Sequence, residues 1–179
     1  MTEKIDLTKR VIVPKGVCIY SSTNDQGKIT GTNPEFLTYS GYEYDELNGQ
    51  DHNIIRHEDM PQSLFYILWT ELQKSREHVP TEVIVFVKNK TKFGGYYWVL
   101  ATVSVTKYKP SGQPALYMSN RVGVYDVSDI NWLENEYKQI KLCESRKLNT
   151  SEISKHKCLV MATELIQGEK YAEIIKKYR

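Results

Sequence analysis

A short run between positions 52 and 61 gathers most of the residues in this sequence that could hold a ligand. It reads His52-Asn53-Ile54-Ile55-Arg56-His57-Glu58-Asp59-Met60-Pro61. An arginine such as Arg56 offers several fixed donors and stays charged, which suits phosphate and carbonyl oxygens. A local explanation competes with this one: Asp59 caps the helix that follows, and Arg56 pairs with Asp59 or Glu58 at the surface. Spacing alone leaves ligand binding and helix capping both open.

Metal and catalytic chemistry have weaker support. The histidines and carboxylates of the run match no metal-binding motif. No Ser/His/Asp or Cys/His arrangement has the local context of a nucleophile, and there is no glycine-rich phosphate loop. The cysteines are odd in number and far apart, so we expect no disulfide framework, zinc cluster or redox pair, and a reducing compartment; they are Cys18, Cys143 and Cys158. These patterns predict a protein that is not an enzyme and has no metal site.

Length, composition and charge argue against further classes of function. The chain has 179 residues, of which 40% are hydrophobic and 26% are charged, so we expect one packed domain with an appendage. The 24 Lys and Arg residues nearly balance the 22 Asp and Glu residues, which gives no argument for nucleic acid or an anionic membrane. No stretch approaches the roughly 18 apolar residues of a membrane helix, and the N-terminus lacks the apolar run of a signal peptide. We therefore expect a cytoplasmic protein that does not insert into a membrane.

The first part of the chain reads as short elements followed by one longer helix. The first ten residues are polar and are expected to be frayed. Extended segments on both sides of the turn at 24–27 give a hairpin. Asn33 and Pro34 then begin a short helix, and a second short helix follows it. Apolar residues next recur at helical spacing over about four turns: Leu64, Phe65, Leu68, Trp69 and Leu72.

The second part of the chain changes to strands and then returns to helices. Three segments rich in β-branched and aromatic residues, at 83–87, 96–107 and 115–125, are joined by short turns, which predicts an antiparallel meander. With the hairpin they give an α+β fold, a five-stranded antiparallel sheet with short helices on one face and a small pocket between them. From Ser128 on, an apolar stripe recurs at coiled-coil spacing: Ile130, Leu133, Tyr137 and Ile140.

The sequence thus divides into an N-terminal extension at 1–17, a sheet domain at 18–127 and a helical C-terminal tail at 128–179. An isolated short helix would leave the apolar stripe of the tail exposed, so the stripe predicts a docking or dimerising element. It does not tell whether the tail helices pair within one chain or between two.

Several motifs, in the same order along residues 19–123, resemble the PAS domains of aerotaxis and energy-taxis receptors. The run at 52–61 carries the resemblance most specifically, and further segments support it: Gly27-Lys28-Ile29-Thr30, Asn33, Phe36, Ser40-Gly41-Tyr42, Glu46-Leu47, Val87-Lys88-Asn89 and Gly94-Gly95-Tyr96-Tyr97-Trp98-Val99. The resemblance implies a PAS fold, non-covalent binding of FAD and a role in redox sensing. Because the chain has no membrane segment, it is similar to the small soluble members that work beside a separate transmembrane receptor.

The resemblance also assigns roles to residues and partners to the chain. It implies cofactor contacts from Arg56, His57, Asp59, Asn33, Phe65, Trp69 and Asn89. On sequence grounds alone, Asn33 fits a helix cap better, and Phe65 and Trp69 fit an ordinary core equally well. The partner is expected to be a transmembrane chemoreceptor or another PAS protein, with the C-terminal helices forming a homodimer or heterodimer. Contact with such a receptor would be the protein's only link to the membrane.

Two departures from the family pattern lead to alternatives. Val83 and Val85 stand where the family usually has Trp and then Gly, and Glu58 stands in place of the usual Pro. A β-branched side chain in place of Gly predicts a narrower flavin pocket. One alternative is therefore a PAS adaptor that holds no ligand and acts through protein contacts alone. A further alternative comes from the resemblance itself, because other branches of the PAS family bind haem: a haem-binding PAS sensor that uses His52 or His57.

Overall fold

The structure, a computed structural model, describes residues 5–76, 79–145 and 152–179. None of the helices among these residues is both long and apolar enough to cross a membrane. The elements in chain order are β1 (Cys18–Asn24), β2 (Ile29–Thr32), α1 (Pro34–Ser40), α2 (Tyr44–Leu47), a single 3₁₀ turn (His52–Ile55), α3 (Gln62–Gln73), β3 (Glu82–Lys90), β4 (Tyr96–Tyr108), β5 (Pro114–Gly123), α4 (Val127–Ser145), α5 (Glu152–Gln167) and α6 (Glu169–Tyr178).

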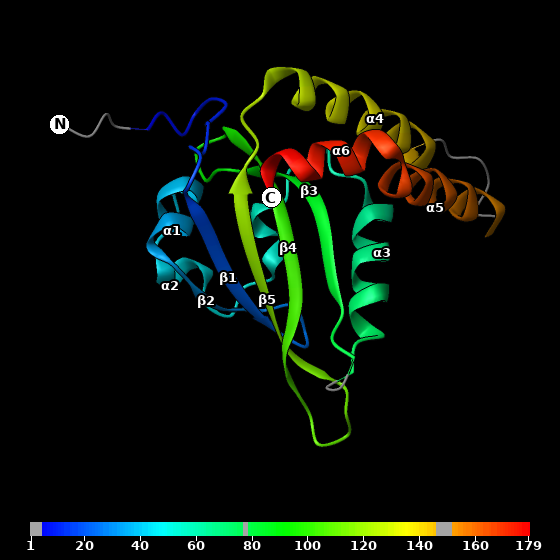
Figure 1. Cartoon of the computed structure of the whole chain (residues 1–179). Coiled ribbons are helices and arrows are strands. Elements are labelled where there is room, and N and C mark those ends of the chain that lie inside the picture. The colour runs from blue at the N-terminus through cyan, green and yellow to red at the C-terminus, as the bar shows by residue number, and fades with distance from the viewer. Residues whose placement is uncertain (1–4, 77–78, 146–151) are drawn as a thin grey trace.

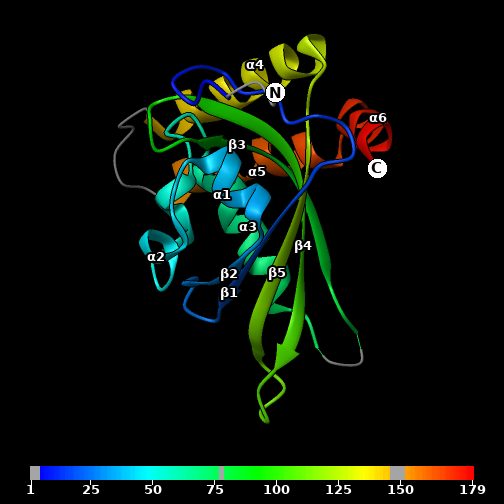
Figure 2. The same ribbon diagram turned by 90° about the vertical axis from the view of Figure 1, so that its left-hand side faces the viewer.

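The five strands form one antiparallel sheet in the order β2-β1-β5-β4-β3. Figure 2 shows α1, α2 and α3 on one face of this sheet and α6 on the other. The helices α4 and α5 cross one end of the sheet, where α5 packs against α3 (Figure 1). We call the face toward α1–α3 the inner face and the opposite one the outer face. The predicted α+β fold with a five-stranded antiparallel sheet and C-terminal helices is confirmed.

The helices of the inner face begin and end as their residue types require. Asn33 caps α1, since its Oδ1 accepts a hydrogen bond from the backbone N–H of Phe36 at 3.1 Å, and Gly41 ends the helix at φ 77°. In α3 the prediction of a cap from Asp59 is wrong. The residue before the helix is Pro61, which offers no side-chain hydrogen bond. The first N–H groups of α3 are capped instead by Glu144, which comes from α4.

The C-terminal tail folds back onto the outer face of the sheet. The stripe of Ile130, Leu133, Tyr137 and Ile140 is at most 2% exposed, so the premise that it would lie open for a partner is wrong. The sequence shows that the stripe is apolar, but not that the chain's own sheet and last helices cover it. At the end of α6, Lys177 pairs with Asp126 and Asp129 at 2.6 and 2.8 Å, which fastens the C-terminus to the start of α4. These ion pairs therefore join the two ends of the tail.

Two buried tyrosines join the tail to the edge strand β3. The hydroxyl of Tyr137 donates to the carbonyl oxygen of Phe86 at 2.7 Å, and the N–H of Phe86 donates to the hydroxyl of Tyr171 at 2.9 Å. Phe86 lies in β3, an outer strand of the sheet that is paired with β4. Its N–H and carbonyl groups that meet the tyrosines therefore face the free edge of the sheet. A buried backbone group without a partner is costly, and the tail supplies both partners here. Burial raises the pKa of Tyr171 to about 12, which keeps its hydroxyl protonated.

The N-terminal segment is more ordered than its composition predicts. The carbonyl oxygen of Leu7 accepts hydrogen bonds from the N–H of Gly95 at 3.0 Å and from the hydroxyl of Thr91. The N–H of Tyr96 donates to the carbonyl oxygen of Lys9 at 3.1 Å. The expectation of frayed residues is therefore wrong for 5–10, and residues 1–4 lie outside the described part. A Cβ on Gly95 would collide with this segment, so the glycine permits the close approach.

The cysteines differ from the prediction as well. Cys143 of α4 and Cys158 of α5 form a disulfide across 15 positions of sequence, while Cys18 is free and exposed. The expectation that no cysteines pair is wrong, because α4 and α5 pack against each other in space. Sequence spacing carries no record of that geometry.

Candidate functional site

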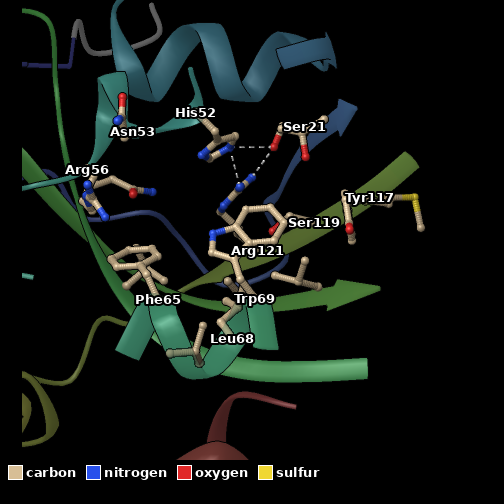
Figure 3. Close-up of a pocket in the computed structure, with 17 residues that line it drawn as sticks. Ser21, His52, Asn53, Arg56, Phe65, Leu68, Trp69, Tyr117, Ser119 and Arg121 are labelled. Carbon is tan, nitrogen blue, oxygen red and sulfur yellow. Dashed lines mark hydrogen bonds between the residues drawn. The ribbon is translucent and has the colours of Figure 1, made fainter. Parts of the chain in front are cut away.

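A cavity of about 110 Å³ lies between α3, the 3₁₀ turn and the inner face of the sheet (Figure 3). Its walls come from β1, β3, β4 and β5 on one side and from the 3₁₀ turn, the residue after it and α3 on the other. Alternation along each strand places every second side chain on this face. The lining residues are Ser21, Thr23, His52, Asn53, Arg56, Phe65, Leu68, Trp69, Val85, Val87, Asn89, Ala101, Val103, Tyr117, Met118, Ser119 and Arg121.

A buried arginine with neutral partners stands at one side of the cavity. Arg121 is 4% exposed, and Figure 3 shows its guanidinium beside Ser21 and His52. Its Nη1 donates to Ser21 Oγ at 2.9 Å and its Nη2 donates to His52 Nε2 at 2.8 Å. Burial lowers the pKa of Arg121 to about 10, so it remains charged near neutral pH. The cavity therefore holds a fixed positive charge that these partners do not neutralise.

The protonation state of His52 follows from its contact with Arg121. Because guanidinium can only donate, His52 Nε2 must carry a lone pair and the imidazole is neutral. Burial, and then the charge of Arg121, lower the pKa of His52 to about 3. Ser21 Oγ lies 3.0 Å from the same nitrogen. The three side chains thus form one network whose only charge is that of the arginine.

Two polar atoms of cavity-lining residues have no hydrogen-bond partner among the described residues: Asn89 Nδ2 and Ser119 Oγ. Asn89 is 2% exposed and Ser119 is 7% exposed. Leaving a buried polar group unpaired costs about 1–3 kcal/mol. Unpaired groups in the same cavity as an uncompensated arginine are the chemistry expected of a site that binds a ligand with oxygen or nitrogen acceptors.

The remaining walls are apolar or aromatic. The rings of Trp69 and Tyr117 meet edge to face with their centroids 5.1 Å apart. The guanidinium carbon of Arg56 lies 4.7 Å from the ring centroid of Phe65, so this cation rests on an aromatic face. Valines and alanine from β3 and β4 form the floor. Such walls suit a flat, largely apolar ring system with polar groups along one edge.

The structure brings together four of the seven predicted site residues. Arg56, Phe65, Trp69 and Asn89 all line the cavity. Asn33 lies elsewhere: its Oδ1 accepts hydrogen bonds from the N–H groups of Phe36 and Tyr20, and its Nδ2 donates to the carbonyl oxygen of Cys18. This is the capping role that its sequence context favours.

His57 and Asp59 turn to the other side of β3. Lys88 points outward there, opposite to the cavity, and its Nζ lies 2.7 Å from Asp59 and 3.2 Å from Glu134 of α4. Burial works to raise the pKa of Asp59, but the hydrogen bond and charge of Lys88 outweigh it, so that pKa is lowered. His57 is half-buried beside the ring of Tyr96, and burial lowers its pKa. The predicted run therefore splits, with Arg56 facing the cavity and its neighbours tying the loop to the tail.

The sequence interpretation missed the polar side of the cavity. Arg121, Ser119 and Tyr117 stand at every second position of β5, so the alternation of side chains along a strand puts the three on one face. An arginine on an inward face was the available signal. His52 was considered only for metal or haem. Ser21 gives no signal in sequence, because its partner Arg121 lies 100 positions away.

No group of three or more His, Cys, Asp or Glu side chains is placed to hold a metal ion in the described ranges 5–76, 79–145 and 152–179.

Comparison with known proteins identifies the class to which this fold and cavity belong. A family model described as the PAS fold matches residues 29–120, which is more than half of the chain. The chain therefore belongs to the PAS family.

One relative among curated proteins is the aerotaxis receptor of Escherichia coli (strain K12), which is 39% identical over 131 residues. The match covers 72% of this chain and 24% of the receptor, so the chain spans about a quarter of the length of that relative. The predicted resemblance to the PAS domains of aerotaxis receptors is confirmed.

Solved structures support the fold. The light state of the blue-light photoreceptor Aureochrome1 LOV is 18% identical, with a TM-score of 0.54 and coverage of 66% of this chain and 89% of that one. The Rhodobacter sphaeroides LOV protein is 12% identical, with a TM-score of 0.55 and coverage of 93% and 91%. At such identities the likeness shows the fold alone.

Proposed function

We propose that this chain is a PAS sensory protein that binds a flavin, FAD, in the cavity beside α3 and reports its redox state by protein contact. The observation that carries the proposal is the buried charge of Arg121 in the same cavity as the unpaired atoms of Asn89 and Ser119. A flavin ring is flat and largely apolar, and its polar edge carries carbonyl and imide groups. Bound flavin would supply a redox centre that takes up and releases electrons.

The chain's own residues fit this cofactor chemically. Arg121 and Asn89 would donate to the polar edge of the ring, while Trp69 and Phe65 would pack against its apolar part. Arg56, bordering the same cavity, would donate to a ring carbonyl or to the pyrophosphate. The 39% identity to a receptor named for aerotaxis supports a taxis role for the signal. We expect a binding and signalling function rather than turnover of a substrate.

Haem fits less well. His57, one of the two candidate ligands, lies on the side of β3 opposite the cavity. The other, His52, already uses its Nε2 to accept from Arg121 at 2.8 Å. Coordination to iron through this nitrogen would displace the arginine and leave a buried cation with one partner fewer. The side chains thus support flavin over haem.

The size of the cavity favours a second candidate, a PAS adaptor without a ligand. Ligand pockets usually measure about 300–1,000 Å³, whereas this cavity measures about 110 Å³. A flavin ring would therefore need the cavity to expand. Val85 and Val87 contribute to the narrow floor, while Val83 lies half-buried nearer the start of β3.

Absorbance of the purified full chain separates the two candidates. Flavin bands at near-stoichiometric ratio to protein support the sensor, and a Soret band would indicate haem. Protein that stays colourless after incubation with excess FAD supports the adaptor. In the flavin case, Arg56→Ala should give folded protein with most of its flavin lost, whereas Arg179→Ala, at an exposed ion pair with Glu82, should keep it. Unchanged flavin content in Arg56→Ala would contradict the assignment of that arginine.

Ser119→Ala tests the polar side of the site. Because Ser119 Oγ has no partner in this structure, its removal should leave the ligand-free protein equally stable or more so. Flavin affinity should fall about three- to tenfold, as expected for one lost hydrogen bond. Loss of stability with unchanged affinity would show that the hydroxyl is structural.

The expected partner of the signalling form is a transmembrane chemoreceptor or another PAS protein, met on the cytoplasmic side. Since the apolar stripe of α4 is covered, the outward faces of α4 and α5 would carry such a contact or a dimer, and Leu142 and Val160 are exposed there. Sedimentation of the full chain tests the dimer. Co-purification with a chemoreceptor should be lost in a Leu142→Glu, Val160→Glu variant that remains folded, and retention would place the contact elsewhere.

A further inference from the structure

The disulfide of the tail lies beside a residue that holds the cavity helix. Cys143 is the third-last residue of α4, and the next residue is Glu144. The carboxylate of Glu144 accepts from the N–H of Gln62 at 3.1 Å, and from the N–H and the hydroxyl of Ser63, both at 2.8 Å. These donors form the first turn of α3. A single side chain next to the disulfide therefore caps this helix from outside.

This cap has no local substitute. The first N–H groups of a helix need partners, and the positive end of its dipole favours a carboxylate. Pro61, at the N-cap position, forms no side-chain hydrogen bond, and α3 has no acidic residue in its first turn. Loss of Glu144 would leave these donors to water. The same helix bears Phe65, Leu68 and Trp69 of the cavity wall, so its anchoring affects the site.

The position of Glu144 depends on the disulfide because of where both lie. Glu144 is the second-last residue of α4, in the turn where helices fray. The only covalent restraint on this turn, besides the chain itself, is the bond from Cys143 to Cys158. Cys158 is 4% exposed, and its helix α5 packs against α3. Cleavage of the bond would free the last turn of α4 from α5 and with it the carboxylate.

We propose that Cys143 and Cys158 form a thiol–disulfide switch that controls, through Glu144, how firmly α3 is anchored at the cavity. In the oxidised form the last turn of α4 is fixed and Glu144 caps α3. In the reduced form that turn frays and the cap is lost for part of the time. Only the effect on flavin affinity rests on the proposed function, since the capping itself needs no ligand.

The chemistry requires a dithiol reductant and balances as thiol–disulfide exchange. A thiolate of the reductant attacks Cys143 Sγ, the half-buried and more accessible sulfur, while Cys158 departs as a thiolate and takes up a proton. The second thiol of the reductant then attacks the mixed disulfide and releases Cys143. Two electrons and two protons pass from the reductant to the cysteine pair, and the reductant becomes a cyclic disulfide.

Hydrogen exchange of the ligand-free full chain tests the proposal directly. The oxidised protein and protein reduced with dithiothreitol are compared by mass spectrometry after thiol labelling with a maleimide. Labelling should find one reactive thiol before reduction and three after it. Reduction should speed exchange in the peptide that covers residues 62–65 about tenfold, because the N–H groups of Gln62 and Ser63 lose their carboxylate. A Cys143→Ser, Cys158→Ser variant should exchange like the reduced protein in both conditions, and Cys18→Ser should still respond.

Glu144 gives the decisive comparison. Glu144→Ala should show fast exchange at 62–65 in both redox states, whereas Glu136→Ala on the same helix should behave like the unmodified chain. If flavin binds, reduction should weaken its affinity about three- to tenfold, in line with a helix cap partly lost. Complete labelling of both cysteines without faster exchange overturns the switch, as does finding three free thiols after oxidation. Faster exchange in a protein that never binds flavin supports the switch and refutes the proposed function.

Discussion

The buried network around His52 predicts that the protein loses stability in mild acid. The pKa of this histidine is lowered to about 3 in the folded chain, from an ordinary value near 6.5. The unfolded chain therefore binds a proton that the folded chain does not. This contribution to stability is complete above the unfolded pKa and is lost as the pH falls from about 6.5 toward 3.

The magnitude follows from the linkage of one proton. If only the unfolded state titrates, the free energy of unfolding falls by about 2 kcal/mol between pH 7 and pH 5. The full shift would correspond to about 5 kcal/mol, but the side chain is partly exposed, so we expect roughly half of that. His52→Gln keeps an acceptor for Arg121 and removes the titration, and it should flatten this part of the pH dependence.

The assay is urea unfolding at pH about 7, 6 and 5, followed by far-ultraviolet circular dichroism. His156→Gln, at an exposed position of α5, is the matched control and should keep the slope of the unmodified chain. The difference between the two variants isolates the buried histidine from carboxylates that titrate in both. Equal slopes for His52→Gln and His156→Gln would refute the inference that His52 is held neutral by burial and Arg121.

Three further substitutions test the contact of the N-terminal segment, the contact of the tail and the floor of the cavity. Gly95→Ala should lower the free energy of unfolding by about 2–4 kcal/mol in thermal or urea unfolding, because the added methyl meets the carbonyl of Lys9; a change below about 1 kcal/mol would contradict this close approach. Tyr137→Phe should cost about 1–3 kcal/mol, since it leaves the carbonyl of Phe86 unpaired, and an unchanged unfolding midpoint would show that water replaces the hydroxyl. Val85→Gly should raise FAD occupancy, measured by absorbance ratio, several-fold despite about 3 kcal/mol of lost stability, from the removed buried side chain and the freer glycine backbone; an empty protein that stays empty would mean that this valine does not close the pocket.

Local sequence signals predicted the elements of the PAS domain well. Asn33 and Pro34 mark the start of α1, and the three segments rich in β-branched and aromatic residues match the antiparallel meander. These signals act between neighbours in sequence, so they survive without knowledge of the fold. The placement of the tail could not be predicted in this way. An apolar stripe is the same whether a partner covers it or the chain's own sheet does.

The site shows the same division between local and distant information. The family motif points to Arg56 and Asn89, and both line the cavity. The motif also points to Asp59 as a cofactor contact. This residue stands three positions from Arg56 but turns toward Lys88 and α4. The opposite directions of Arg56 and Asp59 depend on how the loop runs along the edge of β3. Nor could spacing indicate the pairing of His52 with Arg121, which joins residues 69 positions apart.

The hydrogen bonds that occupy the free edge of β3 affect how the protein can associate with itself. An outer strand with free backbone groups is a template for strand addition and aggregation. Here Phe86 is occupied by two tyrosine hydroxyls. Lys88, two residues on, is occupied too: its N–H meets the sulfur of Met60 and its carbonyl accepts from the N–H of His57. The tail and the loop before α3 thus cover the edge at Phe86 and Lys88, and a truncation that removes the tail would leave backbone groups open to pairing with a second chain as well as an uncovered sheet.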